Sequence, residues 1–403
     1  MKPYIVLLVA FASVHLAQSQ ENKLSLDRAL ALARANRPSI SAAQLRVKSA
    51  RLLRKSMGAF PATRLSVGYT SDPAVGGSDD DLVLTQPLDF FGRTSTAIAV
   101  GNAGILRAEA ELQQVVAEIQ AEVVDTYSEA AAAKALAESA VQSQDIAQRL
   151  ADAMKILVEE GRAAGVQLMR VNIEVERSRL AANQRNAEYR ASLERLSGLL
   201  AVPVNQVAVP GFAEIQVELI EPAALPRNRF DLLLLAADVR AAEADVRVAR
   251  LSSLPELEIQ GRRSAWQDRD SRYGARIQLN IPLFDYGRSR AETNAAKTKT
   301  EAANRALADA TRIAESELSA ARIELTGAQE QLQRYQTILD SARKLVDIST
   351  VGFKEKAITL VELLEGTRAL REVEEGFVEA RLRLAKAQAR YLRASGRILE
   401  LQP

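Results

Sequence analysis

The last third of the chain carries a heptad pattern of apolar and small residues. In two segments, one from residue 373 onward and one between residues 332 and 346, these residues recur in alternating steps of three and four. The pattern predicts two helices that pair along one seam, and a turn around Gly352 between them predicts an antiparallel helical hairpin. The seam positions are Phe377, Ala380, Leu384, Ala387, Tyr391 and Ala394 in one helix and Leu332, Tyr335, Leu339, Ala342 and Val346 in the other.

A second helical hairpin is predicted in the first half of the chain. Its two segments, Arg93 to Glu160 and Val166 to Leu196, lie on either side of Gly161 and Gly165. At about 1.5 Å per residue, the first segment would form a helix roughly 100 Å long. Taken alone, such helices favour a rod-like structural coiled coil over a channel.

Four shorter stretches alternate between apolar and polar residues, which is the pattern of strands with one apolar face. They form two predicted β-hairpins, residues 63–88 and 256–283, with polar connections at Ser71 to Asp81 and at Arg263 to Arg272, the second containing Trp266. The clearest apolar set is Tyr273, Ala275, Ile277, Leu279, Ile281 and Leu283, against Gly274, Arg276, Gln278, Asn280 and Pro282. Weaker sets contain Leu65, Val67 and Tyr69, then Leu82 and Leu84, then Leu257 and Ile259.

Each predicted strand is about long enough to cross an outer membrane at a tilt. The polar set would then face a water-filled lumen and the apolar set would face lipid, although a soluble two-sheet layer is an alternative. Four strands cannot close a barrel, and open edges are not tolerated in lipid, so several chains would have to contribute to one barrel. Three chains would give twelve strands and leave a passage.

The chain also contains an internal duplication. The segment Gln86 to Arg93 resembles the segment Ile281 to Arg288, and Pro87 and Pro282 are 195 positions apart. We therefore expect a first repeat at residues 20–200, a linker rich in proline at 201–227 and a second repeat at 228–403. Each repeat is predicted to run helix, β-hairpin, long helix, turn and returning helix.

Composition excludes several classes of function. The formal net charge is +2, with acidic and basic residues interspersed, so we expect no nucleic-acid partner. The chain has no cysteine, and its only histidine is His15, so a thiolate or histidine metal site, a cofactor and a histidine-based catalytic triad are not expected. No catalytic residue is predicted, and the protein is not expected to be an enzyme.

The first residues have the pattern of a secretory signal peptide. Lys2 precedes an apolar stretch from Tyr4 to Val14, and Ala17, Gln18 and Ser19 follow. This stretch is well short of the roughly 20 residues of a membrane-spanning helix. We expect a signal peptide at residues 1–19, cleaved near Ala17 or Ser19.

The duplication, the two strand hairpins and the Pro-Leu-x-x-x-Gly-Arg motif at both strand exits resemble the TolC-like outer-membrane efflux proteins over nearly the whole chain. The resemblance implies a fold that is mainly α with a small β part, with long helical hairpins forming an α-barrel and a twelve-stranded β-barrel in a homotrimer. It implies an outer-membrane location with a periplasmic helical domain, contact with outer-membrane lipid, and partners in a periplasmic adaptor and an inner-membrane transporter. The implied function is a passive exit channel for efflux or secretion.

The same resemblance suggests site residues. Glu362 and Glu365, one helical turn apart, match the acids that ring the periplasmic entrance in the family. On the sequence alone an ordinary solvated helix face is an equally good account of these two acids. Lys356 stands where the family usually has a tip glycine, and the first copy has Gln167 and Arg170 at the acid positions. The predicted adaptor-contact tips are Gly161, Gly165, Val351, Gly352 and Phe353.

Two other functions fit parts of the pattern. A periplasmic adaptor also uses helical hairpins, but it has one hairpin rather than two tandem copies with strands. A structural coiled coil would explain the heptads and would need no barrel. The sequence names no cargo.

Overall fold

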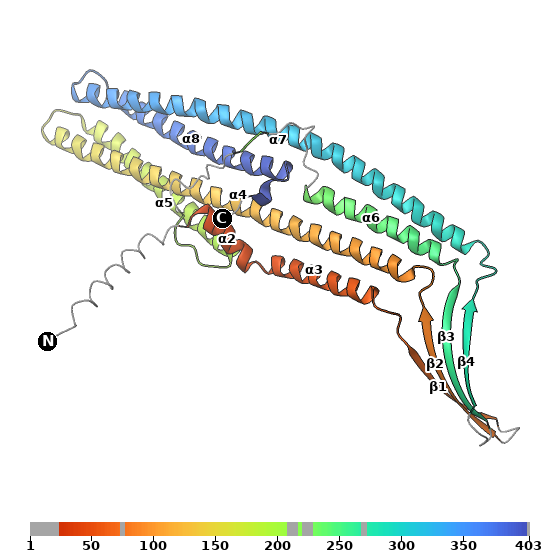
Figure 1. Cartoon of the computed structure of the whole chain (residues 1–403). Coiled ribbons are helices and arrows are strands. Elements are labelled where there is room, and N and C mark those ends of the chain that lie inside the picture. The colour runs from red at the N-terminus through yellow and green to blue at the C-terminus, as the bar shows by residue number, and fades with distance from the viewer. Residues whose placement is uncertain (1–23, 73–76, 208–216, 220–228, 267–271, 401–403) are drawn as a thin grey trace, which may run out of the picture. The chain divides into compact units, whose positions relative to one another are not determined.

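The computed structural model describes residues 24–72, 77–207, 217–219, 229–266 and 272–400 (Figure 1). The predicted signal peptide and much of the predicted linker lie outside these residues. The helices are α2 (Leu26–Asn36), α3 (Pro38–Met57), α4 (Arg93–Glu159), α5 (Gly165–Leu200), α6 (Phe230–Leu251), α7 (Arg288–Lys354), α8 (Leu360–Ala394) and the short 3₁₀ helix η2 (Ile398–Glu400). The strands are β1 (Arg64–Asp72), β2 (Gly77–Leu88), β3 (Glu256–Trp266) and β4 (Arg272–Asn280).

The predicted fold class is confirmed: the protein is mainly helical, with long helical hairpins and four antiparallel strands (Figure 1). Helices α4 and α7 each contain 67 residues, and they begin 195 positions apart at Arg93 and Arg288. The single helix expected before the first strand is instead two helices. Arg37 has an extended backbone between them, since the residue before a proline is disfavoured in the helical region, and Pro38 is the first residue of α3.

The chain forms two compact units. Of the described residues, one unit contains 24–40, 115–207, 217–219, 229 and 314–400, and the other contains 41–72, 77–114, 230–266 and 272–313. The first unit includes both helical hairpin ends, and the second includes all four strands. Helices α4 and α7 pass through both units.

Helices α7 and α8 pack along the predicted heptad seam within the first unit. Tyr391 is completely buried in a cluster with Leu318 and Leu325 of α7. Further along the seam, a Cβ atom on Gly376 would lie 2.5 Å from the ring of Tyr335, so the glycine leaves the space in which the tyrosine ring packs against the backbone of α8. The helical hairpin is thus held by small residues on one helix that receive larger side chains from the other.

Three polar side chains fix the segments that flank the helices of the first unit. The hydroxyl of Tyr127 donates a hydrogen bond of 2.9 Å to the carbonyl of Leu24, and Lys134 Nζ donates one of 2.8 Å to the carbonyl of Val207. The buried Arg229 donates to the carbonyls of Ala314 and Ala394 and pairs with a glutamate of α7. These bonds join the flanking segments to the helices of the unit through buried side-chain donors and backbone carbonyls.

The sheet of the second unit has the strand order β1-β2-β3-β4, with every neighbouring pair antiparallel. Several predicted strand boundaries were wrong. Strand β2 begins at Gly77 and β3 continues through Trp266, so these residues are in the ladder and not in the loops. Strand β4 ends at Asn280, and the alternation that continues to Leu283 lies beyond it. Pro282 has no backbone N–H for a ladder hydrogen bond, which is consistent with that end.

Candidate functional site

The first hairpin tip joins α4 to α5 through a left-handed residue. Gly161 has a φ of 73°, and the N–H groups of Arg162 and Ala163 both donate to the carbonyl of Leu157, at 2.8 and 3.1 Å. This arrangement closes the carboxyl end of α4 in the way that glycine most often does. Gly165 begins α5, and its Cβ position is open, so the backbone does not require a glycine there.

The second tip joins α7 to α8 and lies a few residues later than the predicted turn. Val351, Gly352 and Phe353 belong to the last turn of α7, where Val351 is exposed and Phe353 is partly buried. The left-handed residue is Lys356, with a φ of 61°, and the N–H of Ala357 donates to the carbonyl of Gly352 at 2.7 Å. A lysine here has the backbone conformation that a glycine adopts at the first tip.

Glu362 and Glu365 are both exposed in the first turns of α8. Glu362 belongs to a capping box: its carboxylate accepts hydrogen bonds from the N–H and hydroxyl of Thr359, at 2.6 and 3.0 Å, and its own N–H donates to that hydroxyl. The hydrogen bond from the backbone of Thr359, and to a smaller extent the one from its side chain, hold the pKa of the Glu362 carboxyl below its usual value. Glu362 therefore has a local structural role that the sequence interpretation did not include.

An apolar cluster underlies both tips. Its buried members are Ala151 and Met154 of α4, Val171 of α5 and Leu360 and Leu364 of α8, and Phe353 of α7 packs against it. All four long helices of the first unit contribute to the cluster. The two tips consequently share one core, and Glu362 and Glu365 lie on the side of α8 away from it.

A buried carboxylate near these tips was missed by the sequence analysis. Glu174 of α5 is 6% exposed, and its two oxygens lie 2.7 Å from Arg368 and 3.5 Å from Arg371 of α8. Burial raises the pKa of Glu174, but the hydrogen bond from Arg368 and the charges of the arginines outweigh it, so the pKa is lowered overall. Glu174 and Ser178 lie on the same buried face of α5 as Val171. An acid at a buried position of this helical pattern is the sequence feature that could have indicated the ion pair.

Glu174 also lines a small cavity of about 80 Å³ between helices of the two hairpins. Polar residues from α4, α5 and α8 surround it, among them Gln142, Ser178 and Glu374. The hydroxyl of Ser139 donates to Glu374 at 2.7 Å, which adds a polar connection between α4 and α8 to the one between α5 and α8. The two hairpins of one chain are thus tied together by ionic groups as well as by the apolar cluster.

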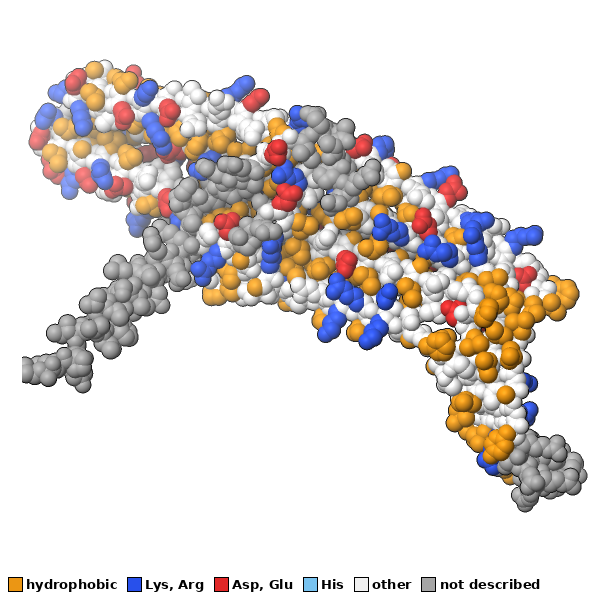
Figure 2. All heavy atoms as spheres, viewed as in Figure 1, with side chains coloured by type: hydrophobic (Ala, Val, Ile, Leu, Met, Phe, Trp, Pro, Cys, Tyr) orange, Lys and Arg blue, Asp and Glu red, His pale blue; other side chains and the backbone are white. Residues whose placement is uncertain are grey.

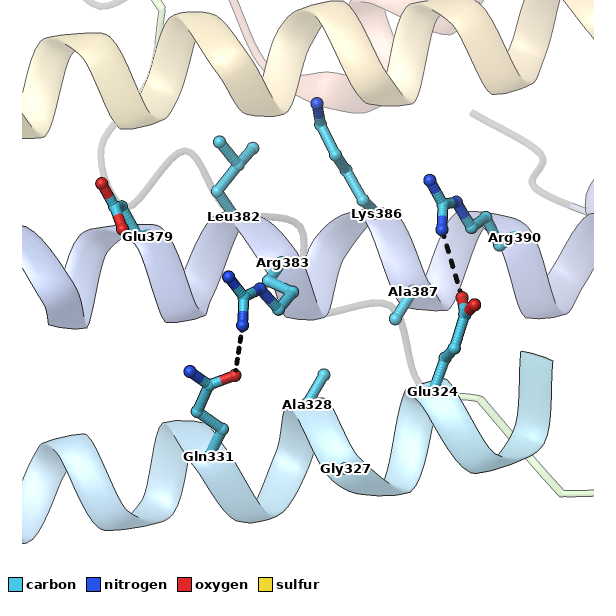
Figure 3. A pocket seen from close by; sticks show the side chains of 10 residues that line it. All are labelled: Glu324, Gly327, Ala328, Gln331, Glu379, Leu382, Arg383, Lys386, Ala387 and Arg390. Carbon is cyan, nitrogen blue, oxygen red and sulfur yellow. Dashed lines mark hydrogen bonds and ion pairs between the residues drawn. The ribbon is translucent and has the colours of Figure 1, made fainter. Parts of the chain in front are cut away.

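A groove of about 810 Å³ follows the exposed side of the α7–α8 seam (Figure 3). Arg383 donates to Gln331 at 2.9 Å and Arg390 pairs with Glu324 at 3.2 Å across it, while Lys386 points away from α7 and pairs with a glutamate of α4. Small residues at Gly327, Ala328 and Ala387 form its floor. An open groove with small residues and ion pairs at its sides has the character of a helix-packing surface rather than of an enclosed ligand pocket.

The two strand exits are built alike. At the first, Asp89 accepts hydrogen bonds of 2.7 Å from the N–H groups of Arg93 and Thr94, which cap α4. At the second, Asp285 accepts bonds of 3.0 Å from the N–H groups of Gly287 and Ser289. Hydrogen bonds from Ser289 and Gly287 lower the pKa of Asp285 to about 2. The glycines of the repeated motif, Gly92 and Gly287, have φ of 75° and 86°, which explains why the motif contains glycine.

The sheet has one apolar and one polar face. Val67, Tyr273 and Ile277 are exposed and point to the apolar face, and Figure 2 shows hydrophobic side chains gathered over the strands and their exits. On the polar face Arg64 pairs with Glu258 at 3.2 Å. Large apolar side chains exposed over a whole sheet face indicate a surface that is covered by lipid or protein.

Long helical hairpins joined to a two-faced sheet of four strands define the class of protein as an outer-membrane export channel. The family model described as outer membrane efflux protein matches residues 29–202 and 223–397. This chain belongs to that family. Its members are the outer-membrane channels of tripartite export systems, so the protein is an efflux channel and not an enzyme, and the adaptor and structural coiled-coil interpretations are set aside.

Individual relatives agree with this assignment. The pyoverdine export outer membrane protein OpmQ of Pseudomonas aeruginosa is 27% identical over 339 residues, covering 79% of this chain and 70% of that protein. The cobalt-zinc-cadmium resistance protein CzcC of Cupriavidus metallidurans is 23% identical over 360 residues, covering 86% and 84%. The MtrE outer membrane channel of Neisseria gonorrhoeae, in its open state, matches with a TM-score of 0.79 at 15% identity over 94% of this chain and 90% of that one, which shows a common fold.

Two features are absent from the described residues. None of the helices they form is both long enough and apolar enough to cross a membrane. They also contain no group of three or more His, Cys, Asp or Glu side chains placed to hold a metal ion.

Proposed function

We propose that three copies of the chain form one continuous exit duct. The three sheets close into a twelve-stranded barrel in the outer membrane, and the helical hairpins form a periplasmic α-barrel. Substrates delivered by an inner-membrane transporter cross the duct passively. Residues 1–19 direct export and are removed, so the mature chain begins shortly before Leu24.

The observation that carries this proposal is the sheet with two open edges and an exposed apolar face. Strands β1 and β4 are the edges. Val67, Tyr273 and Ile277 are 75%, 79% and 73% exposed on the apolar face. Lipid would cover that face, but unpaired edge groups in lipid cost several kcal/mol each, so each β1 needs the β4 of a neighbouring copy.

The hairpin ends are the proposed contacts with a periplasmic adaptor. The residues that we assign to this contact are Gly161 and Gly165 at the first tip and Val351, Gly352 and Phe353 at the second. Both tips lie at the ends of long helices and share one apolar core, so a partner that docks on them would meet a rigid surface.

The periplasmic gate is proposed at the second tip. Glu362 and Glu365 supply two exposed acids there, whereas Gln167 and Arg170 occupy the corresponding positions of the first copy. Three copies would bring six carboxylates to one constriction, and a ring of acids favours the passage of cations.

We propose no single cargo for the duct. The relatives are named for export of pyoverdine and for resistance to cobalt, zinc and cadmium, and these cargoes differ in chemistry. We propose that the inner-membrane partner selects the cargo and that the duct admits what the partner delivers.

The test is to isolate the mature protein from an outer-membrane fraction in detergent and to measure its mass and single-particle shape. We expect a hollow trimer. A detergent-independent monomer or dimer would overturn the proposal. Intact-mass measurement of the same sample would show whether the leader has been removed.

A cross-linking experiment examines the edge contact directly, because the chain contains no cysteine. In Leu65→Cys/Ile277→Cys, one cysteine lies on each edge strand. A bifunctional thiol reagent of about 8 Å, longer than one strand spacing, should join neighbouring copies into a covalent trimer. The same reagent is too short to join β1 to β4 within one copy, since three strand spacings of about 4.8 Å separate them. The two single-cysteine variants are the controls and should give no trimer.

A further inference from the structure

The strand register places two arginines at opposite ends of one row on the polar face of the sheet. In the ladder, Arg64 lies opposite Thr85, Thr85 opposite Gln260, and Gln260 opposite Arg276, so the row crosses all four strands. Residues that pair directly across antiparallel strands point to the same face. The guanidinium groups of Arg64 and Arg276 therefore lie on one face, on the two edge strands.

The arginines of this face differ in their partners. Arg64 pairs with Glu258 at 3.2 Å, and Arg262 pairs with Asp81 at 2.8 Å. Arg276 donates from Nε to the amide oxygen of Gln260 at 2.9 Å. Within the part of the chain that the structure describes, Arg276 contacts no carboxylate. Of the three arginines on this face whose side chains the structure describes, Arg64 and Arg262 are paired with acids and Arg276 is held by a neutral amide.

The opposite face supplies a matched arginine. Arg263 lies opposite Leu82 and Tyr273 in the register, on the face that also carries Val67. It follows Arg262 directly, so it points to the other side of the sheet. Arg263 and Arg276 carry the same charge on adjacent strands, but they belong to different faces.

We propose that Arg276 attracts anions in the lumen of the barrel and sets the ion preference of its outer-membrane section. The proposal rests on the trimeric barrel argued above. Three copies would place three Arg276 side chains in one band of the lumen, and the joining of β1 to β4 between copies would bring Arg64 of a neighbour into the same band, displaced by the stagger of the barrel. A ring of like charges in a narrow passage raises the local concentration of counter-ions. Chloride and the carboxylate or phosphate groups of a cargo are the ligands that a guanidinium group would bind there.

The test is the reversal potential of single channels in planar bilayers under a gradient of potassium chloride. Arg276→Gln should lower the chloride-to-potassium permeability ratio a few-fold relative to the wild type, whereas Arg276→Lys should keep the wild-type ratio because the charge remains. Arg263→Gln removes the same charge from the apolar face and should leave the ratio unchanged. A wild-type ratio in Arg276→Gln would overturn the proposal, and so would an equal shift in Arg263→Gln.

A second measurement uses the wild-type protein alone, so it does not depend on the folding of a variant. Pyrophosphate is added to the bilayer chamber onto which the β-barrel end of the channel opens. It should reduce the chloride current of the wild-type channel, because its negative charges would bind a ring of guanidinium groups. The absence of any block at millimolar pyrophosphate would count against the proposal. These results are separable from those that test the duct itself: if the wild-type protein forms no trimer and no conducting channel, the proposed function fails, whereas a conducting wild type without effects at Arg276 refutes the ring alone.

Discussion

The two hairpin tips have the same backbone and different side chains. Gly161 and Lys356 are 195 positions apart, and both are left-handed, with φ of 73° and 61°. At each tip an N–H beyond this residue closes the preceding helix, from Arg162 to Leu157 and from Ala357 to Gly352. The two turns therefore share one backbone conformation, although the left-handed position is a glycine in the first and a lysine in the second.

The differences between the tips lie where the returning helices begin. Ala164 precedes α5 without a side-chain cap, whereas α8 starts with the complete capping box of Thr359. At an offset of 195, Glu362 and Glu365 correspond to Gln167 and Arg170. The comparison teaches that the fold restricts the turn itself, while the exposed first turns of α5 and α8 are free to differ in charge, which is where we place the gate.

The largest effect is expected from cutting the ionic tie between the hairpins. Glu174→Ala would leave Arg368 and Arg371 without their carboxylate next to an existing cavity. Removing one partner of a fully buried ion pair costs about 3–5 kcal/mol. Since both arginines are partly exposed, we expect about 2 kcal/mol less stability, measured by denaturant unfolding of the purified protein in detergent. Asp145→Ala, which removes an exposed ion pair with Arg149, should change stability by less than about 0.5 kcal/mol.

The same tie should depend on pH. The pKa of Glu174 is lower in the folded protein than its usual value, so its contribution is present above the unfolded pKa of about 4.3 and is lost as the pH falls through the folded pKa. The stability difference between wild type and Glu174→Ala should accordingly be full at about pH 7 and should shrink below about pH 4. Equal stability of the two proteins at neutral pH would show that the tie contributes nothing.

The sequence predicted the elements whose apolar residues recur with a regular period. It did not predict the features that depend on contacts between residues far apart in the chain. The heptads located the α7–α8 hairpin, because seam residues such as Tyr391 are buried at helical spacing, and the duplication with Gly161 and Gly165 located the α4–α5 hairpin. The strand ends were placed wrongly, because pairing with β3 draws Asp79 and Asp81 into β2 although aspartate disfavours strands. Glu174 was overlooked because its partner Arg368 is 194 positions away. Periodicity reports the face of an element, but not which charged groups meet across two elements.

A smaller effect is expected from removing the charges that distinguish the second tip. Glu362→Gln/Glu365→Gln should weaken cation preference a few-fold in planar bilayers, because glutamine keeps the capping bond to Thr359 while the carboxylate charge is lost. Thr359→Ala is the control, since it removes the cap and keeps both charges, so selectivity should remain. Conversely, Gln167→Glu/Arg170→Glu should make the first tip resemble the second and strengthen cation preference. If the glutamine variant has wild-type selectivity, the gate assignment is wrong and Glu362 is a capping residue alone.

The smallest effect is expected at the left-handed residues. A side chain in this conformation costs roughly 1–2 kcal/mol, and glycine loses about 0.5–1 kcal/mol of that advantage through its greater freedom in the unfolded chain. Lys356→Gly should therefore stabilise the second tip by about 0.5 kcal/mol, and Gly161→Ala should destabilise the first by about 1 kcal/mol. Amide hydrogen exchange of the two turns measures both changes in one experiment. Faster exchange at the second tip of Lys356→Gly would mean that the lysine side chain stabilises the turn by contacts that outweigh its backbone strain.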